Sequence, residues 1–303
     1  MAPVDSIEEA VQRVSSTLAG SVVRIGRGPG RGGGVVVAEG AVLTNAHNLR
    51  GSQTTVTFTD GRVEQGRVAG ADVDGDLAVV LVPTAGATPA EWRSEAPPVG
   101  SALFALTAPA GGGLRVTVGR VSAAGRAFRG PRGHLITGGL EHTAPLPHGS
   151  SGSPVVDSAG MLVGVSTHRL GEGFYLAVPA EADLRTRVGA LARGESPRRR
   201  YLGVALLPAP AARRLRAAVG LPERDGLLVR ALEDDGPAAR AGVRAGDLLI
   251  SAGGQALASH DDLLRVLAGL ADGDDLGLGV VRGADQLEIL VSFAETGEGQ
   301  ATA

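Results

Sequence analysis

One short stretch constrains the fold of this chain more than any other feature: His148-Gly149-Ser150-Ser151-Gly152-Ser153-Pro154. Glycines flank the central serine, a proline closes the stretch, and two valines follow it. This pattern is typical of a serine held on a tight turn that leads into a strand. The serine hydroxyl is then exposed and neighbouring backbone N–H groups point outward, as a nucleophile and an oxyanion hole require.

A serine hydroxyl is a poor nucleophile near neutral pH, so a base and an orienting acid are needed elsewhere in the chain. His47 closes the run Leu43-Thr44-Asn45-Ala46-His47, just after an apolar strand, and Asp76 stands at the head of Asp76-Leu77-Ala78-Val79-Val80. The order His47, Asp76, Ser151 is that of the chymotrypsin-type triad, and differs from the order in subtilisins and α/β-hydrolases.

Three blocks resemble the triad motifs of HtrA/Deg-type serine proteases, usually written TNxHV, DLAV and GNSGGP. The blocks are Thr44 to His47, Asp76 to Val79 and Gly149 to Pro154. The resemblance continues into the PDZ domain of that family, on Tyr201-Leu202-Gly203-Val204 and on Gly236 to Ile250, and so covers residues 20–293. Three residues depart from the motifs: Asn48 replaces Val, Ser150 replaces Asn and Ser153 replaces the second Gly. Ser153 matters most, because added bulk near the nucleophile could narrow the site.

The resemblance implies a role for each triad residue. His47 takes the Ser151 proton as general base and returns it to the leaving amine, while Asp76 fixes the histidine tautomer and stabilises the imidazolium. The backbone N–H groups of Gly149 and Ser151 form the oxyanion hole, at about 3 kcal/mol per donor.

The PDZ-like part implies a peptide-binding groove. Its N–H groups at Tyr201, Leu202, Gly203 and Val204 would receive the carboxylate of a peptide C-terminus, and the peptide would add as a strand beside them. Leu264, on the helix that starts near Asp261, would belong to the other wall.

Length and composition fit two folded domains. The chain has 303 residues, 47 of them glycine, and only 3% are aromatic, which suits short strands and tight turns around a core of Val, Leu and Ala. There is no cysteine, so disulfides and thiolate metal sites are excluded and the redox compartment is undetermined. The net charge of −3 argues against a nucleic-acid surface.

The spacing of apolar runs and turns predicts a mainly β chain: two six-stranded antiparallel barrels of the chymotrypsin type, followed by a small α+β PDZ domain. His47 and Asp76 fall on the first barrel and Ser151 on the second, so a cleft between the barrels is the expected site. A helix is expected over Ser6 to Leu18, with Ser6 as its N-cap. The predicted parts are an N-terminal helix or lead-in at 1–19, the protease domain at 20–192, a linker at 193–200, the PDZ domain at 201–294 and a flexible tail at 295–303.

Other readings of single motifs are weaker. The run Gly28 to Gly33 satisfies G-x-G-x-x-G, but it leads into a valine-rich strand, so no helix N-terminus awaits a pyrophosphate and a dinucleotide site is rejected. Asp72 and Asp74 are rival acids to Asp76, which is preferred because it directly precedes the apolar strand. An esterase arrangement stays open only through the order Ser151, Asp157 or Asp183, then His168.

The remaining histidines show no metal-binding spacing, so no metal and no cofactor are expected. They are predicted to be exposed on loops or hairpins, and are His134, His142, His148, His168 and His260.

The motifs and the resemblance together predict an ATP-independent serine endopeptidase that cleaves unfolded or damaged proteins and whose PDZ domain binds peptide C-termini. The alternative is a poorly active protease fold that serves as a PDZ-containing binding or chaperone-like protein, motivated by Ser150 and Ser153. Whether these serines reduce activity, the physiological substrate and the activation trigger are left open. Nucleic acid is not an expected partner, and a homotrimer is suggested by the resemblance alone.

The start of the chain is polar and acidic, and no apolar run approaches 18 residues, so neither a signal peptide nor a membrane segment is predicted. As written, the chain is expected in the cytoplasm. The alternative is the periplasm or the extracellular space, if an N-terminal anchor has been removed.

The primary specificity pocket is expected to be apolar. In trypsin-like enzymes that cut after Arg or Lys, an aspartate about six residues before the nucleophile pairs with the substrate cation. Here that position is Pro145, and the nearest upstream acid is Glu141. Cleavage is therefore predicted after small or medium aliphatic residues, because a substrate cation would lie desolvated without a partner.

Overall fold

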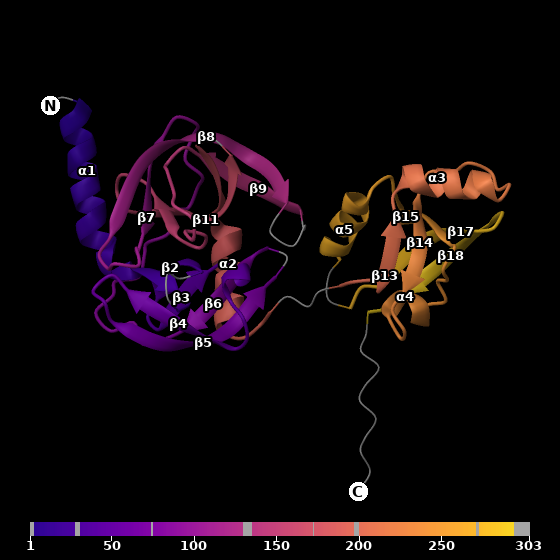
Figure 1. Ribbon diagram of the computed structural model, residues 1–303, viewed down its shortest axis with the longest axis horizontal. Coiled ribbons are helices and arrows are strands. Elements are labelled where there is room, and N and C mark those ends of the chain that lie inside the picture. The colour runs from indigo at the N-terminus through magenta and orange to yellow at the C-terminus, as the bar shows by residue number, and fades with distance from the viewer. Residues whose placement is uncertain are drawn as a thin grey trace, which may run out of the picture. The chain divides into compact units, whose positions relative to one another are not determined.

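The computed structural model describes residues 3–27, 31–73, 75–129, 135–171, 173–196, 200–270 and 273–293. The chain divides into two compact units, Met1–Pro197 and Arg198–Ala303. Figure 1 shows barrels of strands in the first unit and a single sheet with helices in the second. Asp74, His134, residues 28–30, residues 197–199 of the predicted linker and the predicted tail lie outside the described residues.

The first barrel is a closed antiparallel sheet with the strand order β1-β2-β3-β6-β5-β4. Its interior is filled by fully buried valines together with Ile25 and Phe58. Two glycines at the start of β2 allow close approach: Gly34 leaves room for Val42 and Leu43 of β3, and Gly33 leaves room for Ser153, the residue before β10. Its strands are β1 (Val22–Ile25), β2 (Gly32–Ala38), β3 (Ala41–Thr44), β4 (Gln53–Phe58), β5 (Val63–Asp72) and β6 (Leu77–Leu81).

The second barrel closes in the order β10-β11-β12-β9-β8-β7. Register shifts along the pairing of β8 with β9 mark β-bulges. Two closed six-stranded barrels confirm the predicted fold class and exclude the α/β-hydrolase arrangement. Its strands are β7 (Ala102–Thr107), β8 (Arg115–Arg129), β9 (Leu135–His142), β10 (Pro154–Val156), β11 (Leu162–Gly171) and β12 (Phe174–Pro179).

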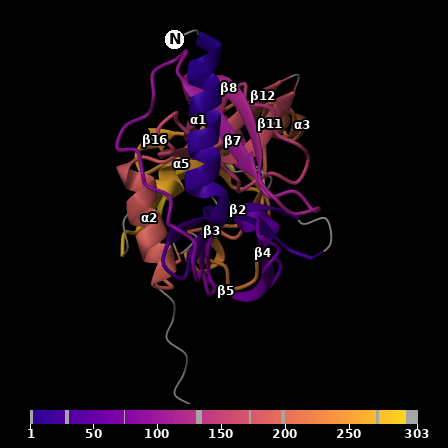
Figure 2. The same cartoon turned by 90° about the vertical axis from the view of Figure 1, so that its left-hand side faces the viewer.

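Two helices pack on the outside of the barrels. Helix α1 (Pro3–Leu18) runs along the first unit, as Figure 2 shows, and buries Ala10, Val14 and Leu18 in the core shared by both barrels. The predicted N-cap at Ser6 is wrong, because α1 begins at Pro3 and Ser6 lies inside it. Helix α2 (Ala182–Ala192) buries one leucine-valine face in the same core. Short 3₁₀ turns lie at η1 (Ala19–Ser21) and η2 (Ala46–Asn48).

The second unit is a sheet in the order β13-β14-β15-β17-β18, with β16 paired to β15. Its apolar face packs against the buried side of α5, where Leu263, Val266 and Leu267 lie. A capping box at Ser259 and Asp262 begins α5. The strands are β13 (Val204–Leu207), β14 (Leu227–Leu232), β15 (Leu248–Ala252), β16 (Gln255–Ala256), β17 (Leu276–Arg282) and β18 (Asp285–Val291), and the helices are α3 (Ala209–Ala218), α4 (Pro237–Arg240) and α5 (His260–Ala268).

In the described part of the chain, none of these helices combines the length and the apolar character needed to cross a membrane.

Candidate active site

His47 and Asp76 are joined on the first barrel. The short turn η2 after β3 presents the imidazole, whose Nδ1 lies 2.9 Å from Oδ1 and 2.8 Å from Oδ2 of Asp76. The backbone N–H of His47 also donates to Oδ1, at 3.1 Å. Asp76 is 3% exposed and has a φ of +54°, a region that non-glycine residues rarely adopt. Strained backbone held in place by several hydrogen bonds is typical of functional sites.

The rival acids do not share this arrangement. Asp72 forms an ion pair with Arg187 and accepts a hydrogen bond from the backbone N–H of Gly75. Asp74 is outside the described residues. Asp76 is thus the acid that the structure places against the His47 ring.

Ser151 lies on the turn that precedes β10 of the second barrel. Gly149 and Gly152 have φ values of +78° and +90°, which a side chain would strain. The N–H of Gly152 donates to the Ser166 carbonyl at 2.6 Å, which fixes the turn against β11. The backbone N–H groups of Gly149 and Ser151 have no acceptor within the described residues, so both are available to a ligand oxygen.

Thr167 links the serine to the aspartate, a connection that the sequence did not reveal. Its hydroxyl donates to Asp76 Oδ2 at 2.9 Å, and its carbonyl accepts from Ser151 Oγ at 3.1 Å. The residue is buried on β11, 91 positions from Asp76 in the sequence. In this arrangement the Ser151 hydroxyl donates to Thr167, so a rotation about the Cα–Cβ bond of Ser151 is needed before His47 can accept its proton. Catalytic hydrogen bonds often form only when substrate is bound.

The carbonyl of Ser151 is held by the first barrel. It accepts from the backbone N–H of Gly33 at 2.7 Å and from Asn48 Nδ2 at 2.8 Å. Asn48 also donates to Thr44 Oγ1 at 3.0 Å and is 1% exposed. Asn48 is the residue that stands where the family motif has valine, and its amide gives the Ser151 turn an additional hydrogen bond.

Ser153 points toward the first barrel. A Cβ on Gly33 would lie 2.0 Å from Ser153 Oγ, so Gly33 leaves the room that this hydroxyl occupies. The hydroxyl is buried and has no hydrogen-bond partner within the described residues. The added bulk of Ser153 is therefore accommodated between the barrels by a glycine.

The segment around Pro145, where the primary specificity pocket is predicted, is held by β8. Thr117 Oγ1 donates to the Pro145 carbonyl at 2.6 Å, and the N–H of Thr143 donates to the Arg120 carbonyl at 3.0 Å. Glu141, the nearest upstream acid, accepts from Ser122 Oγ at 2.9 Å and forms an ion pair with Arg126.

His142 is not exposed, contrary to the prediction made for it. It is completely buried on β9, where its ring stacks on that of Tyr175 with centroids 5.7 Å apart. Neither ring nitrogen has a hydrogen-bond partner in the described part of the chain, and burial lowers the pKa of His142 to about 4. Alternation along β9 turns this ring inward, although its sequence neighbours are polar.

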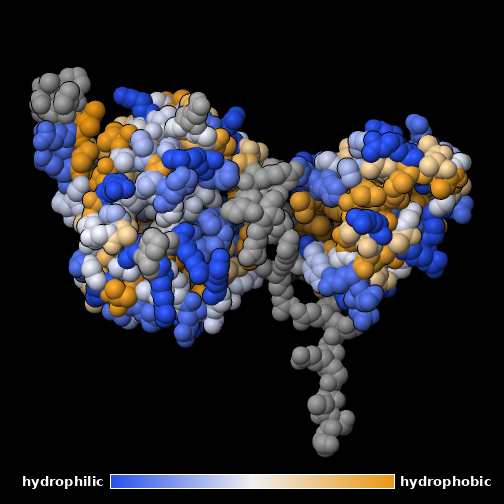
Figure 3. All heavy atoms as spheres, viewed as in Figure 1, coloured by the Kyte–Doolittle hydropathy of each residue, from blue (hydrophilic) through white to orange (hydrophobic). Residues whose placement is uncertain are grey.

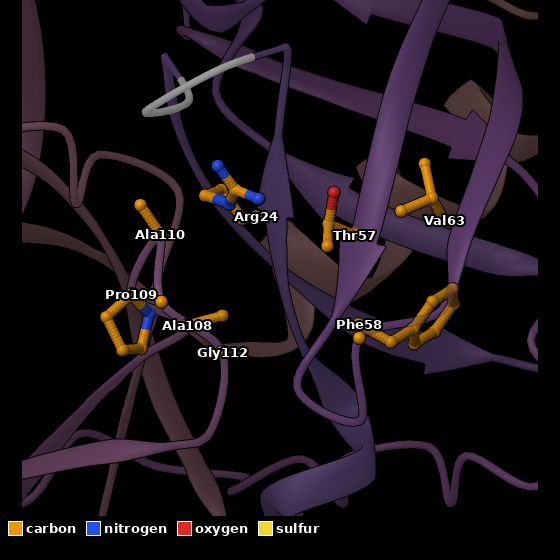
Figure 4. Close-up of a pocket in the computed structure, with 10 residues that line it drawn as sticks. Arg24, Thr57, Phe58, Val63, Ala108, Pro109, Ala110 and Gly112 are labelled. Atoms are coloured by element: carbon orange, nitrogen blue, oxygen red, sulfur yellow. The ribbon is translucent and has the colours of Figure 1, made fainter.

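Neither of two hollows on the first unit is lined by a triad residue. One, of about 280 Å³, lies between the first barrel and the connection from β7 to β8, where Figure 4 shows Arg24, Phe58 and Pro109 around it. The catalytic assignment therefore rests on hydrogen-bond geometry. Within the described residues, no group of three or more His, Asp or Glu side chains could hold a metal ion.

In the second unit, the predicted carboxylate-binding segment leads into edge strand β13. Leu202 is buried in the core and its carbonyl accepts from the N–H of Ala238 at 2.9 Å, while Gly203 has a φ of +70°. The N–H groups of Tyr201, Leu202 and Gly203 have no acceptor within the described residues. The segment is thus fixed through its carbonyls, and its N–H groups are available.

Helix α5 flanks the free edge of β13. Nε2 of His260, at the start of α5, lies 3.2 Å from the carbonyl oxygen of Leu206. Leu264 is half-buried on the same helix. Val204 and Leu206 pair with β14 on one side only, so the other edge of β13 can accept a further strand.

Comparisons with known proteins agree with both units. The model of the trypsin-like peptidase domain matches residues 32–165, and that of the PDZ domain matches residues 201–293. A probable periplasmic serine endoprotease DegP-like from Brucella suis is 32% identical over 275 residues, which cover 87% of this chain and 52% of the relative. The chain thus spans about half the length of that relative.

This chain covers a larger share of two other similar proteins. The putative serine protease HhoA of Synechocystis is 30% identical over 280 residues, 88% of this chain and 71% of the relative. A solved structure described as the HtrA-type protease AlgW with tripeptide superposes with a TM-score of 0.65 and 26% identity, and covers 92% of this chain and 95% of the other. The chain therefore belongs to the family of HtrA-type trypsin-like serine proteases with a C-terminal PDZ domain.

Proposed function

We propose that this chain is an ATP-independent serine endopeptidase that acts on unfolded or damaged proteins. The observation that carries the proposal is the hydrogen-bonded pair of His47 and Asp76, with Ser151 joined to the same pair through Thr167. The alternative of a poorly active binding protein is not favoured, because the bulk of Ser153 faces Gly33.

The proposed mechanism follows from these contacts. With Nδ1 of His47 bound to the Asp76 carboxylate, the ring presents Nε2 to the Ser151 hydroxyl and takes its proton as Oγ attacks the substrate carbonyl. The N–H groups of Gly149 and Ser151 stabilise the oxyanion. The imidazolium then returns the proton to the leaving amine. Water attacks the acyl-enzyme as His47 takes its proton, and His47 returns this proton to Ser151 Oγ when the acid product leaves.

An active-site fluorophosphonate probe tests the nucleophile. The wild-type protein should be labelled, Ser151→Ala should not, and Ser158→Ala, which changes an exposed serine, should be labelled like the wild type. Absence of labelling in the wild type would contradict the enzymatic proposal.

The proposed primary specificity is for small or medium aliphatic residues before the cut. Pro145 carries no charge, and Glu141 is already engaged by Ser122 and Arg126, so a substrate cation finds no free carboxylate there. Mass-spectrometric mapping of cuts in unfolded casein checks this specificity. A majority of cuts after Arg or Lys would show it to be wrong.

The second unit is proposed to bind peptide C-termini. A peptide would add to the free edge of β13, its carboxylate against the N–H groups of Tyr201, Leu202, Gly203 and Val204, and Leu264 would contact its apolar side chain. Calorimetry should show weaker binding for a C-terminally amidated peptide than for the free acid, because charge-assisted hydrogen bonds are lost. Equal affinities for the two peptides would refute the groove assignment.

Domain boundaries, assembly and compartment belong to the same proposal. We propose a protease domain at 20–192 and a PDZ domain at 201–294, joined by the linker at 193–200. The homotrimer that the resemblance suggests is part of this proposal, and light scattering at micromolar concentration tests it. The Brucella relative is named periplasmic, which favours an exported location over the cytoplasm, and fractionation of the native host decides between them.

A further inference from the structure

A second hollow, of about 330 Å³, lies on the first barrel and is rich in arginine. Arg27, Arg31 and Arg50 line it, together with Gln53 and Gln65 of the adjoining strands β4 and β5. Figure 3 shows hydrophilic residues gathered over this barrel. None of the described residues that line the hollow carries a carboxylate. We call this hollow, with its three arginines, the cationic hollow.

The three guanidinium groups differ from most other arginines of the first unit. Arg93 and Arg187, for example, form ion pairs with aspartates. Among the described residues, Arg27, Arg31 and Arg50 have no ion-pair partner and no side-chain hydrogen bond, although the chain as a whole carries a net charge of −3. Like charges gathered without counter-charges destabilise a fold, so their arrangement fits the binding of an anionic ligand.

Two arginines of the cationic hollow lie close in sequence to the contacts that hold the Ser151 turn. Arg31 is followed by Gly32 and Gly33, whose N–H binds the Ser151 carbonyl. Arg50 follows Asn48, whose amide binds the same carbonyl, by two residues. Both arginines therefore lie within two residues of the contacts that hold the catalytic turn to the first barrel.

The proposed proton transfer by His47 indicates which half of a substrate lies against the cationic hollow. His47 protonates the leaving amine, so the residues that follow the cut leave the site on the His47 side, which is the first barrel. The acyl half lies on the second barrel, beside Thr167 and the wall at Pro145. The cationic hollow therefore meets substrate residues on the C-terminal side of the scissile bond.

We propose that Arg27, Arg31 and Arg50 form a subsite for Asp and Glu side chains located two or three residues after the scissile bond. Guanidinium groups bind carboxylates through paired N–H donors, and the hollow is large enough for such side chains. The inference rests on the proposed endopeptidase function. It adds a second determinant of specificity beside the aliphatic residue before the cut.

Quenched fluorescent peptides test the subsite. All carry the same aliphatic residue before the cut, and the second and third residues after it are Glu-Glu, Gln-Gln or Lys-Lys. The wild-type ratio of kcat/KM for the Glu peptide over the Gln peptide should be about 10 at low ionic strength and should fall as salt is added. In Arg31→Gln/Arg50→Gln this ratio should approach 1. A control with the same change in charge, Arg185→Gln/Arg214→Gln, alters exposed arginines outside the hollow and should keep the wild-type ratio.

Cleavage of the Gln peptide separates this inference from the proposed function. No cleavage of any peptide by the wild type overturns the endopeptidase proposal. Cleavage of all three peptides at equal rates overturns the subsite alone, and so does a ratio that survives in the Arg31 and Arg50 variant. A single-stranded oligonucleotide that binds the wild type but not this variant, with no peptide preference, would assign the hollow to nucleic acid instead.

Discussion

His142 should make the protease unit sensitive to acid. Its pKa is about 4 when it is buried, against 6.5 for an ordinary histidine. The unfolded chain therefore binds a proton between these two values that the folded protein does not, so stability is complete above pH 6.5 and is lost as the pH falls toward 4. At 1.36 kcal/mol for each pH unit, the loss is about 3 kcal/mol.

His142→Phe isolates this contribution. The phenyl ring keeps the stack on Tyr175 and breaks no hydrogen bond, because neither nitrogen has a partner within the described residues. Urea denaturation is followed by the fluorescence of Trp92, the only tryptophan, which packs against the core of the first unit. Carboxylates contribute equally to both proteins, so the difference between their losses from pH 7.5 to pH 4 reports His142.

We expect the wild type to lose about 3 kcal/mol more than the variant over that range. Equal losses would refute the reasoning, because they would mean that His142 titrates alike in the folded and unfolded states. A variant that is already far less stable at pH 7.5 would show instead that the imidazole makes a contact the phenyl ring cannot replace.

Three further changes test separate parts of the structure. Asp76→Asn should reduce kcat by about 10⁴, because the amide favours the wrong imidazole tautomer, and steady-state kinetics on a cleaved peptide measure the loss. Asn48→Val should slow fluorophosphonate labelling about 5-fold, because one hydrogen bond to the Ser151 carbonyl is lost; an unchanged rate would remove Asn48 from the positioning of the nucleophile. Arg282→Met should lower the urea midpoint of the second unit, because it leaves the carboxylate of Asp247, only 1% exposed, without its bidentate partner; urea denaturation followed by circular dichroism should show this, with the Trp92 transition unchanged as the control.

The sequence predicts the barrels well because each strand carries its own alternating pattern and turn signals. The contact of His47 with Asp76 could also be anticipated from the motifs and their order in the chain, and the structure places the two residues next to the ends of paired strands, β3 and β6. The burial of His142 could not, because it depends on the register of β9 against Tyr175 of β12. A polar neighbourhood in the sequence says nothing about which face of a bulged strand turns inward.

The same limit explains why the departures at Asn48 and Ser153 could be noticed but not interpreted. Each departs from the family motif, and the sequence alone links only Ser153, of these two, to a possible loss of activity. The structure places both against the glycines that open β2: a Cβ on Gly32 would lie 2.1 Å from Asn48 Nδ2, and one on Gly33 would lie 2.0 Å from Ser153 Oγ. These glycines give the two polar side chains their room between the barrels, where the Asn48 amide donates to the Ser151 carbonyl. The departures therefore belong to one tightly packed contact, so a substitution at any of its members acts on the position of the Ser151 turn.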